Sequence, residues 1–187
     1  MSTGTEADLV TVIVDDHRAI EGVFVALESG EGNPQGRRDL ADHMIAELVR
    51  HSIAEEEHMY PAAREHLDGG DEIADHEIKE HTEVERLLKQ FEDVDPDDPR
   101  FDQLLSEITE NVRHHVQEEE NDLLPKLRSA CSEEKLRDLG EKVLRAKKIA
   151  PTRPHPAAPH TPPANLILNP GAGMIDKIRD SLSGRTT

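Results

Sequence analysis

Histidine and glutamate stand four residues apart at two separate places in this sequence. The stretch HSIAEEEHMYP contains His51 and Glu55, and the stretch HVQEEENDLLP contains His115 and Glu119. Residues four apart lie on one face of an α-helix, with β-carbons about 6 Å apart, so each pair can converge on one point. Imidazole nitrogens and carboxylate oxygens together suit iron or manganese, and zinc is also compatible with them. The spacing therefore predicts metal ligands on two helices.

The two stretches are copies within an internal repeat of 64 residues. The shift superposes ligand-type residues and prolines without a gap: His51 on His115, Glu55 on Glu119, Glu56 on Glu120 and Pro61 on Pro125. It also superposes DHRAIEGVFVALE on EHTEVERLLKQFE, which brings His17 onto His81 and apolar residues onto apolar ones. We therefore expect two copies of a helical hairpin, each with one histidine on its first helix and a His-x-x-x-Glu motif on its second.

Helices must position these residues, because apolar side chains recur with helical spacing. A first helix ends at the loop SGEGNPQG, and further helices are expected at about 37–66, 72–92, 100–129 and 132–148. Pro61 could kink the second of these, and the segment DVDPDDP supplies a cap for the fourth. This pattern predicts an all-α, up-down-up-down four-helix bundle built from two pseudo-repeated helical hairpins, plus a short fifth helix.

The bundle places the four repeated histidines at one level. His17 and His81 each precede the end of their helix by 12 residues, which is roughly 18 Å. His51 and His115 follow the start of theirs by a comparable distance, so one histidine from each helix can face the interior. Four imidazoles and two carboxylates buried together would be costly unless they were paired or bound to metal. Two cations bridged by two glutamates would satisfy them.

Composition narrows the classes of partner. The 187 residues carry a net charge of −18, which disfavours DNA, RNA and acidic membranes as partners. The single cysteine, Cys131, excludes a disulfide within the chain and a cysteine-based zinc or iron–sulfur site. We see no signal peptide and no apolar stretch of membrane-spanning length, so we expect a cytoplasmic protein.

The chain divides near Ala150, with a bundle at 1–150 and a different composition at 151–187. The segment PTRPHPAAPHTPP is expected to be an extended linker, because proline disfavours a helix interior. The segment MIDKIRDSL (174–182) then spaces Met174, Ile175, Ile178 and Leu182 along one helical face. Three alternatives remain for it: docking on the bundle, binding a protein partner, or a disordered tail.

These motifs resemble those of the hemerythrin-like, or HHE cation-binding, family over about residues 8–130. The resemblance rests on His17 in DDHR, on HSIAEEEHMYP, on His81 in KEHTEV and on HVQEEENDLLP. It implies a four-helix bundle with a non-haem di-iron site, in which two iron ions share carboxylate and oxo or hydroxo bridges. By matched positions, the implied ligands are His17, His51, His81 and His115, with Glu55 and Glu119 as bridges.

The sequence departs from oxygen-carrying hemerythrins, which resemble it but use a fifth histidine four residues before the one on the third helix. Glu77 stands there instead, and its carboxylate could bind metal and leave the site more open, which disfavours simple oxygen carriage. His58 could bind metal or support a ligand, because Glu-x-x-His keeps both residues on one face. Tyr60 either forms a hydrogen bond near the centre or lies in the core or at the surface. Glu56 and Glu120 either hydrogen bond to ligands, face solvent or bind metal themselves.

The remaining histidines lack these signals. His114 is turned about 100° from His115 and is expected outside the centre or beside a ligand. Four others have no histidine at the repeated position and are expected to be solvated, although the last two could bind adventitious metal: His43, His66, His155 and His160.

The ligand set and the resemblance together predict a di-iron protein that binds or reacts with dioxygen, hydrogen peroxide or nitric oxide in oxygen, redox or nitrosative stress. As an enzyme it would consume peroxide or nitric oxide. The alternative is a non-enzymatic iron or oxygen sensor that acts through a partner bound by the tail. A ferritin-like iron carrier ranks last, because Asp122 replaces the histidine of Glu-x-x-His in the second repeat.

Overall fold

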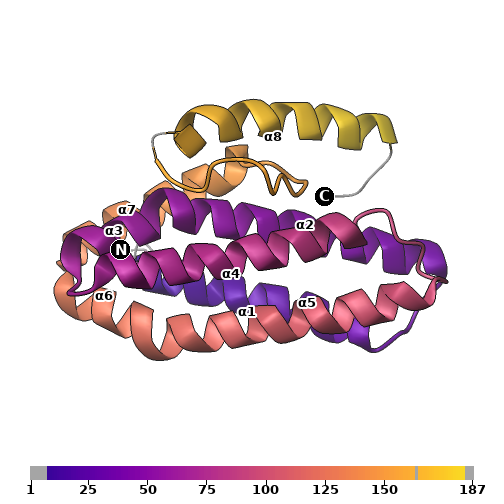
Figure 1. Ribbon diagram of the computed structural model, residues 1–187, viewed down its shortest axis with the longest axis horizontal. Helices are drawn as coiled ribbons and strands as arrows, with labels where there is room; N and C mark the ends of the chain where they lie inside the picture. The colour runs from indigo at the N-terminus through magenta and orange to yellow at the C-terminus, as the bar shows by residue number, and fades with distance from the viewer. Residues whose placement is uncertain (1–7, 163, 184–187) are drawn as a thin grey trace, which may run out of the picture.

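The computed structural model describes residues 8–162 and 164–183, and within them the chain is helical without strands (Figure 1). This confirms the predicted all-α class. The elements in chain order are α1 (Leu9–Glu28), α2 (Pro34–Ala54), η1 (Glu55–Met59), α3 (Tyr60–His66), α4 (Gly70–Phe91), α5 (Pro99–Glu118), η2 (Glu119–Leu123), α6 (Leu124–Ala130), α7 (Glu133–Ile149) and α8 (Ala164–Ser183).

Short polar side chains begin the helices. Asp8 accepts a hydrogen bond from the Thr11 backbone at the start of α1, and Asn33 caps α2 just before a proline. Asp98, from the predicted cap segment DVDPDDP, caps α5 in the same way. These caps mark where the helices begin. The loops between the helices are short, and they fix the heights of the helices relative to one another.

The bundle is a closed ring of four helical columns. α1 contacts α2, the α2–α3 column contacts α4, α4 contacts α5, and α5 contacts α1 (Figure 1). The fifth helix, α7, packs against α1, α2 and η1. None of the helices among the described residues is long and apolar enough to cross a membrane.

The core consists of two hydrophobic blocks with a polar layer between them. Along α1, Leu9 and Ile13 belong to one block, and Phe24 and Leu27 belong to the other, with buried His17 between them. The first block includes α7, whereas the second block closes around the aromatic pair of α4 and α5. The sequence thus confines its buried polar side chains in the bundle largely to one level.

The second helix of each hairpin is interrupted by a π-helical turn, where the sequence predicted a continuous helix or a kink at proline. The turns η1 and η2 occupy the same repeat position, and each ends just before the residue that precedes Pro61 or Pro125. In each turn the backbone bond spans five residues, from Tyr60 N–H to the Glu55 carbonyl and from Leu124 N–H to the Glu119 carbonyl. A proline ring clashes with the carbonyl four residues before it, so a wider turn relieves the conflict.

The C-terminal segment forms a layer of its own over the bundle. The residues 151–162 run as a non-helical strap, as the prolines predict, and α8 lies above them in Figure 1. α8 begins ten residues before the predicted 174–182 segment and packs against α7. Gly173 allows this approach, because a β-carbon there would lie 2.2 Å from the Ile149 carbonyl oxygen.

The two described residues of the predicted apolar face of α8 point away from this contact. Met174 and Ile175 are 65 % and 58 % exposed, whereas Asp176 is buried. The side chains of Ile178 and Leu182 lie outside the described residues. The boundary between a 1–150 domain and a 151–187 tail stays a prediction of the sequence.

Candidate metal centre

Six side chains from the four columns of the bundle converge in the polar layer. They are 4 % exposed or less and come from α1, α2, η1, α4, α5 and η2 respectively: His17, His51, Glu55, His81, His115 and Glu119. The sequence predicted the same six residues as metal ligands. The structure brings them together in overlapping groups whose ligand-type atoms lie within 4.8 Å of one another.

Two histidines form the first half of the cluster, which we call the His17/His51 position. The Nε2 atom of His17 lies 3.3 Å from Glu119 Oε2, and that of His51 lies 3.1 Å from Glu55 Oε1. All four side chains form one group of potential ligands. A cation among them would meet two nitrogens and two carboxylate oxygens.

The other two histidines form the second half, the His81/His115 position. The Nε2 atom of His81 lies 3.4 Å from Glu55 Oε2, and that of His115 lies 3.6 Å from Glu119 Oε1. The two imidazole Nε2 atoms face each other at 3.1 Å. Each glutamate therefore presents one oxygen to each position, which is the arrangement of a carboxylate that bridges two cations.

Several of these buried atoms have no hydrogen-bond partner among the described residues. They include Nε2 of His17, both carboxylate oxygens of Glu55 and Oε2 of Glu119. A buried polar atom without a partner is costly, and native structures contain few of them. The atoms converge on the points where cations would lie, so the ligand set fits a metal centre. The sequence supplies nitrogen and oxygen ligands without sulfur, which suits iron, manganese or zinc.

Carboxylates outside the cluster lie beside all four imidazoles, and three of them are within hydrogen-bond distance of the Nδ1 atom, those beside His17, His81 and His115. Each Nδ1 atom faces an acidic side chain: His17 faces Glu120 at 2.8 Å, His51 faces Asp16 at 3.5 Å, His81 faces Glu56 at 3.0 Å and His115 faces Glu80 at 3.0 Å. A carboxylate that accepts from Nδ1–H directs the lone pair of Nε2 toward the cluster. Glu120 and Glu56 thus contact the imidazoles of His17 and His81, as in one of the three roles that the sequence left open for them.

Burial and neighbouring charge move the pKa values of the ligands far apart. Burial and Glu119 raise the pKa of Glu55 well above its ordinary value. Burial also lowers the pKa of His51 to about 4, whereas for His115 the nearby carboxylates, Glu119 first, outweigh burial and raise the pKa to about 10. Protons and cations therefore compete for the same atoms, so metal binding would release protons.

Tyr60, at the start of α3, lies at the centre, which is one of the positions that the sequence left open for it. It is fully buried, its hydroxyl donates to Glu119 Oε1 at 3.0 Å, and the hydroxyl oxygen of Tyr60 lies 3.0 Å from His81 Nε2. Burial, followed by Glu119, raises its pKa well above the ordinary value, so the hydroxyl keeps its proton. Its counterpart in the other repeat is Leu124.

Glu77 also lies beside the His81/His115 position. Its side chain is buried, and Oε2 lies 3.0 Å from Nδ1 of His115. The Glu77 carboxylate also forms a group of potential ligands with His115 and Glu119. Its counterpart in the first repeat is Ile13, which is fully buried. The His81/His115 position therefore has a further oxygen donor that the His17/His51 position lacks.

The structure does not place His58 with the six side chains of the centre, so the idea that it binds metal or supports a ligand stays a prediction. Its Nε2 lies 3.9 Å from the neighbouring Glu57, and it belongs to none of the potential ligand groups among the described residues. Its pKa is lowered by burial and then by Lys142 of α7. The three-residue spacing from Glu55 assumed an α-helix, whereas the intervening π turn rotates His58 off the ligand face.

Sequence reasoning missed four residues around the centre. Asp16 and Glu80 fall on each other under the 64-residue shift, so the repeat itself could have revealed them. His155 and His160 were expected to be solvated. Instead, His155 Nε2 lies 2.9 Å from Asp176, and His160 Nδ1 lies 3.1 Å from an oxygen of Glu56.

The comparisons with known proteins include a matching family model and two relatives. The model of the hemerythrin HHE cation-binding domain matches residues 8–127. An uncharacterized hemerythrin-like protein of Schizosaccharomyces pombe is 32 % identical over 171 residues, which cover 91 % of this chain and 84 % of that protein. A DNA nickase of Nostoc is 30 % identical over 131 residues, which are 69 % of this chain and only 36 % of that protein.

A solved structure shares the fold. The crystal structure of a hemerythrin HHE cation-binding domain-containing protein from Mycobacterium kansasii superposes with a TM-score of 0.66 at 22 % identity. The match covers 76 % of this chain and 86 % of that one.

Proposed function

The chain belongs to the hemerythrin HHE cation-binding family, and we propose that its buried centre binds two iron ions and reacts with dioxygen, hydrogen peroxide or nitric oxide. The observation that carries the proposal is the pair of histidine sites that share Glu55 and Glu119. A single cation at the His17/His51 position would still leave Glu55 Oε2 without a partner, and the facing Nε2 atoms of His81 and His115 would have no metal to bind. Two cations would use both oxygens of each glutamate.

The protein would contribute orientation and exclusion of water. Bound iron supplies the one-electron chemistry that these side chains lack. The outer carboxylates hold the imidazole rings, and the two hydrophobic blocks enclose the layer from both ends. Tyr60 holds a proton at its hydroxyl, 3.0 Å from a carboxylate oxygen, where it can donate a hydrogen bond to a small bound molecule.

Burial supports a small oxidant in preference to a large substrate. The six candidate ligands are almost fully buried, so only a molecule of a few atoms can reach them without displacing a helix. A role in oxygen, redox or nitrosative stress follows from such chemistry, with consumption of peroxide or nitric oxide as the enzymatic form. The cytoplasm is our proposed location.

Metal analysis and spectroscopy test the proposal directly. Protein loaded with ferrous iron under nitrogen and then exposed to air should hold about two irons per chain and develop near-ultraviolet absorption bands typical of ferric iron. A second addition, of peroxide or of nitric oxide, should change those bands within the mixing time. A protein that takes up no iron, or that holds zinc under the same conditions and stays colourless, would exclude the proposal.

A sensor remains the second candidate, because the C-terminal strap reaches the outer carboxylate of His81 through His160. Metal occupancy could then be transmitted to α8 and to a protein partner. Replacing the exposed Met174 and Ile175 by serine tests this candidate. Loss of partner binding with unchanged iron chemistry would favour the sensor. Nucleic acid stays an unfavoured partner, because the net charge of −18 repels phosphate.

A further inference from the structure

The internal repeat gives the bundle two equivalent faces beside the metal centre. On the α1/α5 face, defined by Glu120 and Glu21, arginines of the bundle neutralise both carboxylates. Arg18 Nη1 donates to Glu120 Oε1 at 2.9 Å, and Arg113 Nη2 donates to Glu21 Oε1 at 2.8 Å. Glu120 in turn accepts from a ligand imidazole. The bundle alone therefore completes this face.

The α2/α4 face carries the matching carboxylates, Glu56 and Glu85, without the matching arginines. The residue that corresponds to Arg18 is Thr82, and the residue that corresponds to Arg113 is Val49. The Thr82 hydroxyl donates to the Ile78 carbonyl of its own helix, and Val49 is buried in the core. Neither side chain can donate to a carboxylate in place of an arginine.

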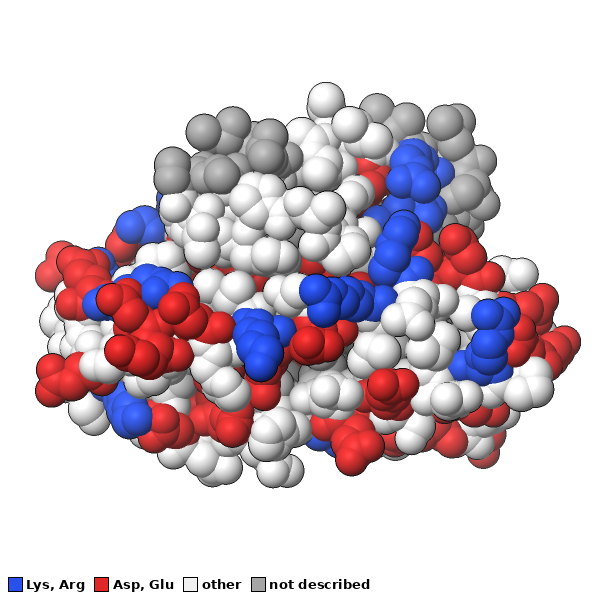
Figure 2. All heavy atoms as spheres, in the orientation of Figure 1, with Lys and Arg blue, Asp and Glu red and all other residues white. Residues whose placement is uncertain are grey.

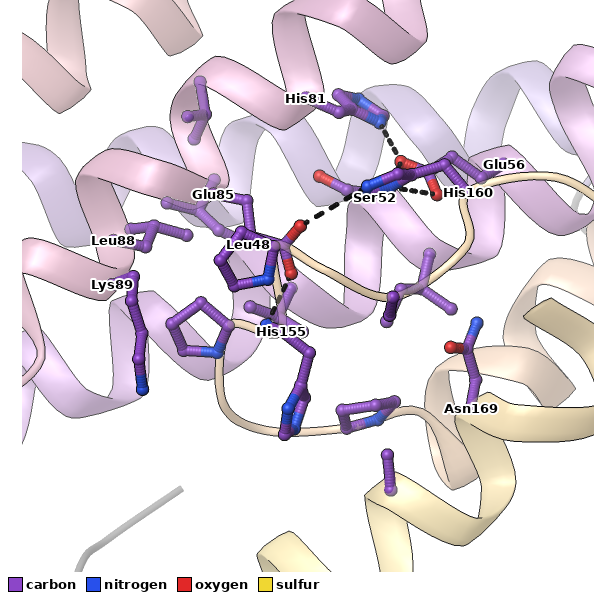
Figure 3. A pocket seen from close by; sticks show the side chains of 18 of the residues that line it. Leu48, Ser52, Glu56, His81, Glu85, Leu88, Lys89, His155, His160 and Asn169 are labelled. Carbon is purple, nitrogen blue, oxygen red and sulfur yellow. Dashed lines mark hydrogen bonds and ion pairs between the residues drawn. The ribbon is translucent and has the colours of Figure 1, made fainter.

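The C-terminal strap supplies the missing donors, as Figure 3 shows. His160 Nδ1 lies 3.1 Å from Glu56 Oε2, and the backbone N–H of His155 donates to Glu85 at 2.7 Å. Glu56 accepts at the same time from Nδ1 of the ligand His81 at 3.0 Å. A continuous chain of contacts thus runs from the strap to a candidate metal ligand.

The strap is held in this place by α8 and the bundle. Asp176 of α8 accepts from His155 Nε2 at 2.9 Å and from the backbone N–H of Arg153 at 3.2 Å. Asn169 of α8 donates to Glu57, two residues after a bridging glutamate, at 3.0 Å. Between strap and bundle lies a cavity of about 400 Å³ with largely apolar walls, one end of which reaches Glu56. In Figure 2, lysine and arginine side chains lie along part of the boundary between the C-terminal layer and the bundle.

We propose that His160 is a positioning residue of the metal centre and that the strap and α8 complete it, in the role that Arg18 performs on the opposite face. The inference rests on the proposed metal function. His160 fixes Glu56, Glu56 fixes the His81 ring, and the ring presents Nε2 to the cluster. Because coupling is reciprocal, metal binding should tighten the strap as the strap tightens metal binding.

Full-length variants test the inference with ferrous iron as the probe, under nitrogen. His160→Ala should weaken iron binding by about tenfold, the lower end of the effect of removing an outer support of a ligand. His160→Ala combined with Thr82→Arg should recover most of that loss, because the arginine then stands where the repeat predicts it. His66→Ala serves as the matched control, because His66 is exposed and its imidazole lies 3.4 Å from Glu65 Oε2. Hydrogen exchange of residues 151–162, with and without iron, supplies a readout that is independent of activity.

Each outcome decides the inference. Iron should slow exchange in the strap of the wild type and of the double variant, and should have little effect on His160→Ala. If His160→Ala binds iron as tightly as the wild type, the positioning role is wrong while the di-iron function stands. If the affinity falls and Thr82→Arg restores nothing, the strap acts through packing alone and the proposed role of His160 is again excluded. A wild type that binds no iron would remove the proposed function and this inference together.

Discussion

The two halves of the metal centre descend from one pattern but differ in what surrounds them. At the His17/His51 position, the repeat places buried Ile13 and Leu124. At the His81/His115 position, the same places hold Glu77, which forms a group of potential ligands with His115 and Glu119, and Tyr60, which donates to Glu119. The His17/His51 position is therefore enclosed by apolar side chains and has four potential protein ligands. The His81/His115 position has additional oxygen atoms within reach.

From this difference we expect the two positions to differ in function. If the proposed iron ions were bound, the further oxygen donors at the His81/His115 position would favour ferric over ferrous iron there. The apolar side chains at the His17/His51 position would offer no further ligand. A small oxidant would therefore bind more readily there.

The largest expected effect comes from the two residues that the halves share. Glu55→Ala and Glu119→Ala should each reduce bound iron from about two ions to fewer than one per chain, because each substitution removes an oxygen from both positions. The loss of iron should also lower the melting temperature measured in its presence. Equal effects of the two variants would support a symmetric bridge. Full iron content in either variant, measured against His66→Ala, would contradict it.

Single histidine substitutions test whether the halves are unequal. His17→Ala should cost more iron affinity than His81→Ala, since Glu77 and Tyr60 remain near the second position. Iron titrations of the two variants under nitrogen give the comparison. Adding Glu77→Gln to His81→Ala should lower the iron affinity of that variant to the level of His17→Ala. Identical titration curves for the two single variants would mean that the additional donors do not matter.

Tyr60→Phe should have a moderate effect on stability. It removes the hydroxyl that donates to Glu119 and leaves a buried carboxylate oxygen with one partner fewer, which costs about 1–3 kcal/mol. Urea unfolding of the protein without added metal measures that cost. We expect the iron content to persist and the absorption bands to shift. Leu124→Val, a cavity change at the repeated position, should leave the bands where they are.

The smallest effect concerns the pH dependence of strap docking. The hydrogen bond to Asp176 raises the pKa of His155 against the opposing effect of burial, with Glu85 adding to the rise and Lys89 opposing it. A raised histidine pKa stabilises the docked state fully below about pH 6.5 and loses that contribution as the pH rises through the raised value.

Asp176 behaves in the opposite sense. Burial alone would raise its pKa, but His155 and the backbone N–H groups of Arg153 and Thr152 lower it. Its contribution is present above about pH 3.8 and disappears only in stronger acid. Hydrogen exchange in the strap, corrected for the intrinsic pH effect, should therefore quicken modestly from pH 6 to pH 9. His155→Gln should reduce this dependence to the part that comes from His160, whose pKa is also raised by its hydrogen bond to Glu56, and an equally steep response in that variant would refute the assignment.

How far the sequence predicts this centre depends on whether a contact is local. His51 and Glu55 lie on one helix turn, and the internal repeat extends the pattern to the other hairpin, so the ligands and their common level could be predicted. His160 meets Glu56 across 104 residues of chain, and neither periodicity nor the repeat marks it. The predicted direction of His58 depended on a regular helix, and the sequence signals a proline but not the π turn before it.

The two π turns also limit how the bundle can move. A π turn can in principle migrate along a helix by passing its additional residue to the next turn, which would rotate the side chains it passes. Pro61 and Pro125 block migration toward the C-terminus, and migration toward the N-terminus would swing Glu55 and Glu119 out of the polar layer. Each bridging carboxylate is thus locked in register from both sides. The bundle can loosen at its strap or its ends while the spacing between the two shared glutamates stays fixed.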